Sequence, residues 1–190
     1  EFKMGDGRYK EITVRELLNQ TSGMADTVFA EKSLPQPGNL QEAVARLGEA
    51  TLRRDPGTAW HYHNPNYQVA ARLVEAVSGE PFAAYIKTHI LEPLGMNTTF
   101  AAEHFAATGL PQGYIHAYGR AVPLPEPVWY LGGAGGIVTT ADDLGKWLVL
   151  HSATNTTDII SSESLNTMHT ATSSVKSYAL GWIPGEHNGV

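Results

Sequence analysis

Apolar residues recur along this chain mainly with helical spacing, and polar capping residues mark where several of these runs begin. Thr13 and Glu16 form a capping-box pattern before an apolar pair, which predicts a short helix ended by residues 21–23. Asn39 precedes apolar positions three and four residues apart, which predicts a second helix over residues 40–52. The first quarter of the chain is therefore expected to be helical, with a loop between the two helices.

The same pattern continues through the rest of the chain. Further helices are predicted over residues 64–78, 82–90, 142–150 and 162–168. The first of them ends at Gly79, which suits a left-handed stop, and is expected to bury Tyr67, Ala70, Ala71, Val74 and Val77. Thr140 is placed to cap the third, with Asp142 and Asp143 in its first turn.

Between these helices the composition changes to polar residues, glycine and proline. A short strand or a hairpin is expected near residues 113–118, followed by an extended loop with prolines at 123, 125 and 127. Close to the end, Tyr178–Ile183 has the composition of a strand, and residues 184–189 that of a hairpin turn. The pattern predicts a mainly helical domain over residues 1–177 that begins a strand in residues 178–190.

Composition and charge exclude several classes of function. The 190 residues, 42% of them hydrophobic, are enough for one domain with a core, and the net charge of −6 argues against a nucleic-acid surface. The absence of cysteine excludes disulfides, thiol nucleophiles and thiolate metal sites. No apolar run is long enough to span a bilayer. Because the chain opens on Glu1 without an initiator methionine, we expect it to be a piece of a longer protein.

The candidate chemistry centres on Tyr62 and Asn64, a phenol and a carboxamide two residues apart where a helix begins. A phenol there can carry a proton and the carboxamide can bind a substrate amide; alternatively, the aromatic ring is packed and Asn64 is an N-cap. His61 and His63 alternate as some metal ligands do, but no third ligand stands at a telling spacing. The sequence therefore predicts no metal and no cofactor.

Four further motifs surround this triplet, and together they carry a resemblance to a known family. They are Ile12–Gly23, Pro56-Gly57, residues 90–96 (Ile-Leu-Glu-Pro-Leu-Gly-Met) and residues 135–144 (Gly-Gly-Ile-Val-Thr-Thr-Ala-Asp-Asp-Leu). In this order and spacing the chain resembles the serine β-lactamase-like family of class C β-lactamases, DD-peptidases and penicillin-binding protein-like esterases. The resemblance covers nearly all of residues 9–183.

The resemblance implies an α+β parent protein, with residues 1–177 as its helical domain including the cleft loops. Residues 178–190 would begin the C-terminal part of its α/β domain, at the start of an antiparallel sheet. Family members form an acyl-enzyme on the serine of a Ser-x-x-Lys motif. Tyr62 matches the tyrosine that exchanges protons with this serine and with the leaving group, and Asn64 the residue that binds the substrate amide. The implied substrates are β-lactams, D-amino-acid peptides or esters, and the implied location is periplasmic or extracellular.

The serine nucleophile does not appear at the position in the sequence where the family has it, before the tyrosine motif. Ser173 and Lys176 spell Ser-x-x-Lys, but they follow Tyr62 where the family places the motif before it, and no apolar helical run follows them. We therefore expect a solvated loop there, a Ser-x-x-Lys upstream of Glu1, and no turnover by this chain alone. His187 and Gly189 fit the third family motif, His-x-Gly, but also fit a hairpin turn.

Two other interpretations stay open from the sequence. The chain could be a non-catalytic helical binding module that keeps only the fold of the family. Alternatively, a second polypeptide could supply the missing strands and the serine. In that last case an incomplete sheet edge at Tyr178–Ile183 would favour self-association.

Overall fold

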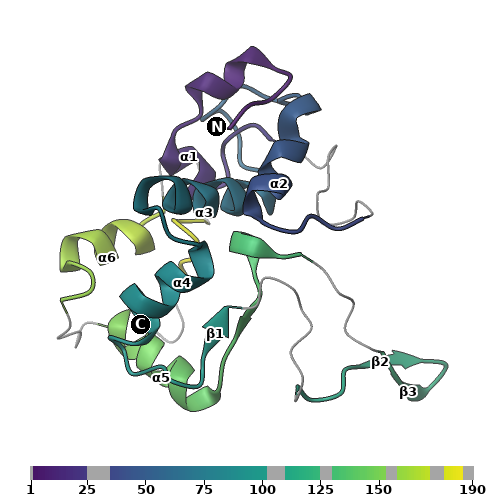
Figure 1. Ribbon diagram of the computed structural model, residues 1–190, viewed down its shortest axis with the longest axis vertical. Coiled ribbons are helices and arrows are strands. Elements are labelled where there is room, and N and C mark those ends of the chain that lie inside the picture. Colours follow the sequence, from purple (N-terminus) through teal and green to yellow (C-terminus); the bar gives the residue numbers. More distant parts are fainter. Residues whose placement is uncertain are drawn as a thin grey trace.

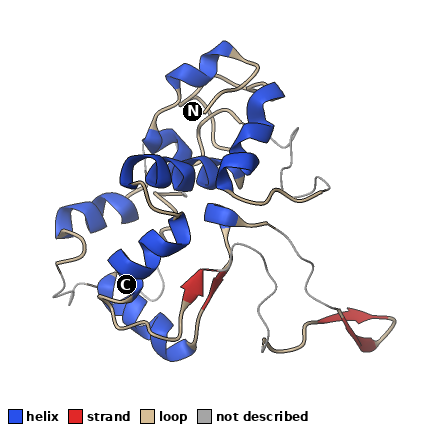
Figure 2. Cartoon of the chain, viewed as in Figure 1, coloured by secondary structure: helices blue, strands red, loops and turns tan. Residues whose placement is uncertain are grey.

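The computed structural model describes residues 2–24, 35–101, 110–124, 130–152, 158–171 and 178–185. Its longest helix, α3 (Pro65–Ser78), contacts α1, α2, α4 and the 3₁₀ turn η4, and it lies between these elements in Figure 1. The α-helices are α1 (Val14–Leu18), α2 (Leu40–Ala45), α3, α4 (Phe82–Ile86), α5 (Ala141–Leu150) and α6 (Ser162–His169). Figure 2 shows how little strand accompanies them, and the prediction of a mainly helical chain is confirmed.

Short 3₁₀ and π-helical turns accompany these helices. They are η1 (Gly7–Glu11), η2 (Arg46–Glu49), the π-helical η3 (Lys87–Leu91) and η4 (Gly132–Ala134). Two of them, η2 and η3, directly continue α2 and α4. The turn η2 corrects the second predicted helix, which keeps α-helical geometry only to Ala45 rather than to residue 52. Gly48 lies in the turn that replaces it, where the low helix propensity of glycine favours an early end.

Capping signals predicted the helix starts correctly. Thr13 and Glu16 form the expected capping box at α1, and the side chain of Asn39 accepts a hydrogen bond from the amide of Glu42 at α2. Thr140 caps α5 in the same way through the amide of Asp143. Gly79 ends α3 with φ of 76°, in the left-handed region where glycine carries no Cβ penalty.

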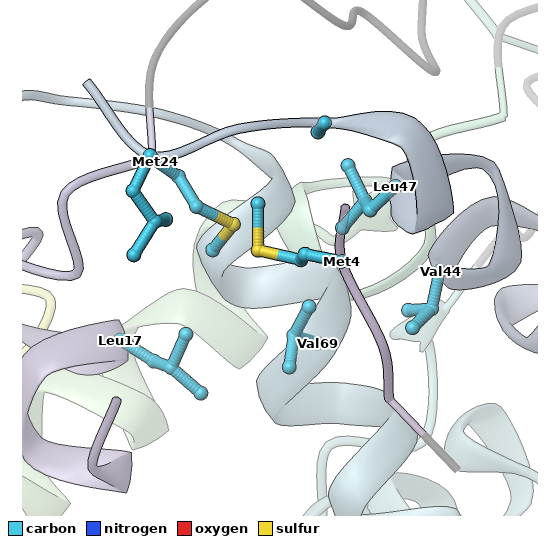
Figure 3. Close-up of a cluster of buried hydrophobic side chains, with 8 residues drawn as sticks. Met4, Leu17, Met24, Val44, Leu47 and Val69 are labelled. Carbon is cyan, nitrogen blue, oxygen red and sulfur yellow. The ribbon is translucent and has the colours of Figure 1, made fainter. Parts of the chain in front are cut away.

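The buried face of α3 differs from the predicted one. Ala71 is buried as predicted, but Val77, also expected inside, is 81% exposed. The helix also buries Val69 and the polar Asn66 and Gln68, which were not predicted to be inside. Val69 joins one core cluster with residues from α1, α2 and the N-terminal segment, drawn in Figure 3. In that view the side chains of Met4 and Met24 meet between Leu47 and Leu17, so the flexible thioethers fill the centre of the cluster.

Two small antiparallel sheets complete the described structure. Strands β1 (Phe100–Ala101) and β4 (Ile137–Val138) pair beside α5, and β2 (Tyr114–Ala117) pairs with β3 (Arg120–Pro123) in a projecting hairpin (Figure 1). Of the two alternatives predicted near residues 113–118, the structure has the hairpin. Tyr118 and Gly119 have φ of 52° and 73°, the signs that a tight two-residue hairpin turn requires.

The strand predicted at Tyr178–Ile183 is wrong. Residues 178–185 form no strand; the amide of Ala179 instead donates to the carbonyl oxygen of Trp182 across a tight turn, with Gly181 at φ of 84°. Trp182 then packs against His151 and His169, the residues that follow α5 and end α6. Because these contacts come from distant segments, the strand-like composition alone did not decide the local conformation. Of the helices in the described ranges, none combines the length and apolarity needed to cross a membrane.

Candidate functional site

Tyr62 and Asn64 lie on the loop that leads into α3. Side chains alternate along this loop: Trp60 and Tyr62 both contact the ring of Tyr178, whereas His61 and His63 pack against each other. Tyr62 is 52% exposed and His63 only 2%. The loop therefore presents its phenol to solvent while anchoring itself through the histidine side.

Gln20 holds this loop from beneath. Its side-chain Oε1 accepts hydrogen bonds from the backbone amide of His63 over 2.9 Å and from Nδ2 of Asn66 over 2.5 Å. Gln20 is buried and has φ of 64°, a left-handed conformation that is uncommon for a residue with a side chain. A residue held in this conformation directly beneath the amide between Tyr62 and Asn64 fixes the position of both.

A second hydrogen bond completes the anchor at the first turn of α3. Ser22 Oγ donates to Oδ1 of Asn66 over 2.6 Å, so both ends of this carboxamide are engaged. Ser22 and Asn66 are buried, in surroundings where hydrogen bonds are strong and their loss is costly. The start of α3 is thus tied to residues 20–22, more than forty positions earlier in the chain.

Backbone bonds join the same two segments. The amide of Gly57 donates to the carbonyl oxygen of Thr21 over 2.8 Å, and that of His61 to Gln20 over 2.9 Å. Gly57 has φ of 77°, and a Cβ there would meet Oε1 of Glu16 at 2.7 Å, so this turn position requires glycine. Residues 20–24 and 53–63 therefore form one hydrogen-bonded unit under the exposed phenol. The motifs that carry the family resemblance include only part of each segment.

Asn64 occupies the residue before α3, but its side chain does not cap the helix. Its backbone is already helical, with φ of −55° and ψ of −39°, and its carbonyl oxygen accepts from the amide of Tyr67 over 2.9 Å. Asn64 is thus at the N-cap position, as the alternative interpretation predicted, but without the side-chain hydrogen bond of a capping residue. Its carboxamide is not used by the helix and is available to a ligand.

Tyr178, which the sequence analysis assigned no role, backs Tyr62. The two rings meet edge to face with centroids 6.4 Å apart, and Tyr178 is 7% exposed. Next to it the Tyr67 hydroxyl donates to the carbonyl oxygen of Leu18 over 2.7 Å. Burial, with Tyr178 and Tyr62 nearby, raises the pKa of Tyr67 well above its usual range, and burial also raises the pKa of Tyr178. Both therefore remain neutral phenols behind the exposed one.

The glycine-rich segment packs against α3 through close backbone contact. A Cβ on Gly133 would lie 2.3 Å from Cβ of Ala71 and 2.4 Å from the carbonyl oxygen of Tyr67. Only glycine lets the turn η4 approach the first turns of α3 this closely. This contact braces α3 at Tyr67 and Ala71.

Four other residues were predicted as candidates for the site from the sequence. Ser173, Lys176, His187 and Gly189 lie outside the residues that the structure describes. Within the described ranges, no three His, Asp or Glu side chains gather closely enough to hold a metal ion. The residues that sequence reasoning missed are Gln20, Asn66 and Tyr178. Gln20 lies within the motif Ile12–Gly23, and this motif is the only feature of the sequence that points to it.

Comparison with known proteins identifies the family to which this chain belongs. The family model described as Beta-lactamase matches residues 3–190. The chain belongs to the beta-lactamase family. Its members are hydrolases, so the resemblance given by the sequence motifs is confirmed.

Individual relatives agree with this placement. The chain is 32% identical over 141 residues to the putative penicillin-binding protein PbpX of Bacillus subtilis (strain 168), which covers 72% of this chain and 34% of PbpX. It is 29% identical over 160 residues to the unguisins hydrolase ungD of Aspergillus violaceofuscus (strain CBS 115571), covering 78% of this chain and 28% of that protein. These curated relatives are about three times as long as the part of them that the chain spans.

A solved structure has the same fold over most of the chain. The octameric penicillin-binding protein homologue from Pyrococcus abyssi superposes with a TM-score of 0.71 and 30% identity, over 84% of this chain and 38% of that one. The helical arrangement around α3 is therefore the arrangement of a penicillin-binding protein-like fold.

Proposed function

We propose that this chain supplies the proton-carrying phenol and a substrate-binding carboxamide of a serine hydrolase that acts on amides or esters through an acyl-enzyme. The observation that carries the proposal is the pairing of an exposed Tyr62 with an uncommitted Asn64 carboxamide on one loop locked by Gln20. Positioning of this kind lowers the barrier of a reaction because the reacting groups need no reorganisation. The membership in a family of hydrolases supports the reaction class.

In this proposal Tyr62 takes the proton of the attacking serine hydroxyl and passes it to the leaving nitrogen or oxygen. The hydroxyl oxygen bonds to the carbonyl carbon, and collapse of the tetrahedral species breaks the bond to the leaving group. Asn64 holds an amide of the substrate, since a carboxamide offers both a donor and an acceptor. The half-exposed phenol gives a substrate direct access to the proton carrier.

The serine is proposed to come from a Ser-x-x-Lys motif outside these 190 residues, and not from Ser173. Two properties support this proposal: Ser173 follows Tyr62 in the chain, and the chain spans about a third of its curated relatives. The substrates proposed are β-lactams, D-amino-acid peptides or small esters. The names of the relatives, a penicillin-binding protein and an unguisins hydrolase, are compatible with small-molecule or peptide substrates.

Hydrolysis of nitrocefin and of p-nitrophenyl acetate by the 190-residue chain tests the assignment of the nucleophile. We expect no turnover above the buffer rate, and the same result for Ser173→Ala. Turnover that Ser173→Ala abolishes would show that the local Ser-x-x-Lys is the nucleophile. Labelling of the full-length protein with a fluorescent penicillin or a fluorophosphonate tests the reaction class, and failure of both labels would favour a non-catalytic module.

A further inference from the structure

A small cationic pocket lies directly beside the loop that carries Tyr62. It has a volume of about 170 Å³ and is lined by Gly23, Met24, Arg53, Arg54, Ala59, Trp60 and His61. A carboxylate with a short side chain fits such a volume.

Arg53 and Arg54 both line this pocket, and both are exposed. Neither Arg53 nor Arg54 forms an ion pair within the described part of the chain, although the protein carries a net charge of −6. The neighbouring acid, Asp55, is held elsewhere: its Oδ1 lies 2.6 Å from NH1 of Arg8. The two cations are therefore left to an external anion.

The backbone under the pocket is rigid, so the cations are presented from a fixed base. The amide of Arg53 donates to the carbonyl oxygen of Gly23 over 2.9 Å. Gly23 has φ of 83°, and a Cβ there would lie 2.2 Å from the carbonyl oxygen of Arg54, so the two segments approach as closely as backbones can. Trp60, 45% exposed, adds an aromatic wall suited to the apolar part of a ligand.

The geometry points to a carboxylate-binding subsite formed by Arg53, Arg54 and Trp60. Planar guanidiniums pair with carboxylates through two parallel hydrogen bonds, which matches the fork of either arginine. Trp60 is two residues before Tyr62, so the subsite adjoins the loop that carries the proposed proton carrier. A role of this subsite in the selection of acidic substrates rests on the proposed function. Binding of a carboxylate to the subsite does not depend on that function.

Binding of a matched pair of probes tests the subsite without requiring catalysis. N-acetyl-D-alanine carries the carboxylate and N-acetyl-D-alaninamide is its neutral isostere. In an NMR titration we expect the acid to shift the side-chain NεH signals of Arg53 and Arg54 and the indole NH of Trp60. The amide should bind about tenfold more weakly, the loss expected for a charge-assisted pair at a partly exposed site.

Variants and competitors make the outcome decisive. Arg53→Gln and Arg54→Gln should each weaken binding of the acid about fivefold without affecting the amide, since each removes one charge-assisted pair. Arg15→Gln, an equal charge change at an exposed position of α1, is the control and should leave both affinities unchanged. Circular dichroism verifies that each variant is folded. Equal affinity for acid and amide, shifts confined to other residues, no binding, or tighter binding of inorganic phosphate would each overturn the subsite. The result stands whether or not the chain hydrolyses any substrate.

Discussion

The backbone amide of His63 donates to Oε1 of Gln20 over 2.9 Å, although 43 positions separate the two residues. Both are buried, and the amide belongs to the residue between Tyr62 and Asn64. Any movement of Gln20 is therefore transmitted to the two side chains proposed to act on a substrate.

Gln20→Met removes the acceptor while keeping the length of the side chain. The amide of His63 and Nδ2 of Asn66 would both lose their acceptor in a buried position, which costs about 2–4 kcal/mol of unfolding free energy. Urea unfolding followed by circular dichroism measures the loss. Gln41→Met, an equal change on the exposed face of α2, should alter stability by about 0.5 kcal/mol or less. A loss at Gln20 no larger than at Gln41 would contradict its role as an anchor.

Gly133→Ala tests the close contact between η4 and α3. The added methyl would lie 2.3 Å from Cβ of Ala71, so the turn must move away from the helix at a cost of about 1–3 kcal/mol. Gly145→Ala is the matched control, because a Cβ there meets nothing within 4 Å and alanine favours the interior of α5 by roughly 0.5–1 kcal/mol. Thermal unfolding should shift in opposite directions for the two variants. A neutral Gly133→Ala would show that the contact is loose.

The hydrogen bonds of Asp143 predict how the unfolding free energy of the protein changes as the pH falls. Lys146 lies 2.7 Å from Oδ1, while the hydroxyls of Thr98 and Thr99 and the Thr98 amide donate to Oδ2. Its pKa is therefore held well below the ordinary value of 3.8. A carboxyl with a depressed pKa in the folded state contributes stability that is present above 3.8 and is lost as the pH falls below it.

Denaturant unfolding between neutral pH and pH 2 measures this contribution. We expect Asp143→Asn to lower stability at neutral pH and to flatten the fall in acid, because the mutant has no carboxyl to protonate. Asp142→Asn, at the exposed neighbouring position, should keep the fall. Parallel curves for wild type and Asp143→Asn would contradict the assignment.

The sequence predicted well those features that depend on neighbouring residues. The cap of Thr13, the stop at Gly79 and the hairpin turn at Gly119 each follow from a few adjacent positions, and each is present. The strand at Tyr178–Ile183 failed because Trp182 packs against His151 and His169, which a local pattern cannot reveal.

The site was predictable to the same degree. Tyr62 and Asn64 could be proposed from their spacing and from the surrounding motifs. The anchor of Gln20 and the ring of Tyr178 behind Tyr62 could not, because each contact joins segments more than forty residues apart. Such contacts have no periodicity, so only the folded chain reveals which buried polar residues support the loop.

The proposed role of Tyr62 as proton carrier is tested most directly by the rate of acyl-enzyme formation in the full-length protein that contains this chain. Intact-mass spectrometry after mixing with a penicillin or an activated ester measures this rate. If Tyr62 carries the proton, Tyr62→Phe should slow acylation by about 10²–10⁴-fold. Tyr114→Phe, the same change on the exposed face of the hairpin, should leave the rate unchanged. Equal acylation rates for Tyr62→Phe and wild type would show that Tyr62 does not carry the proton.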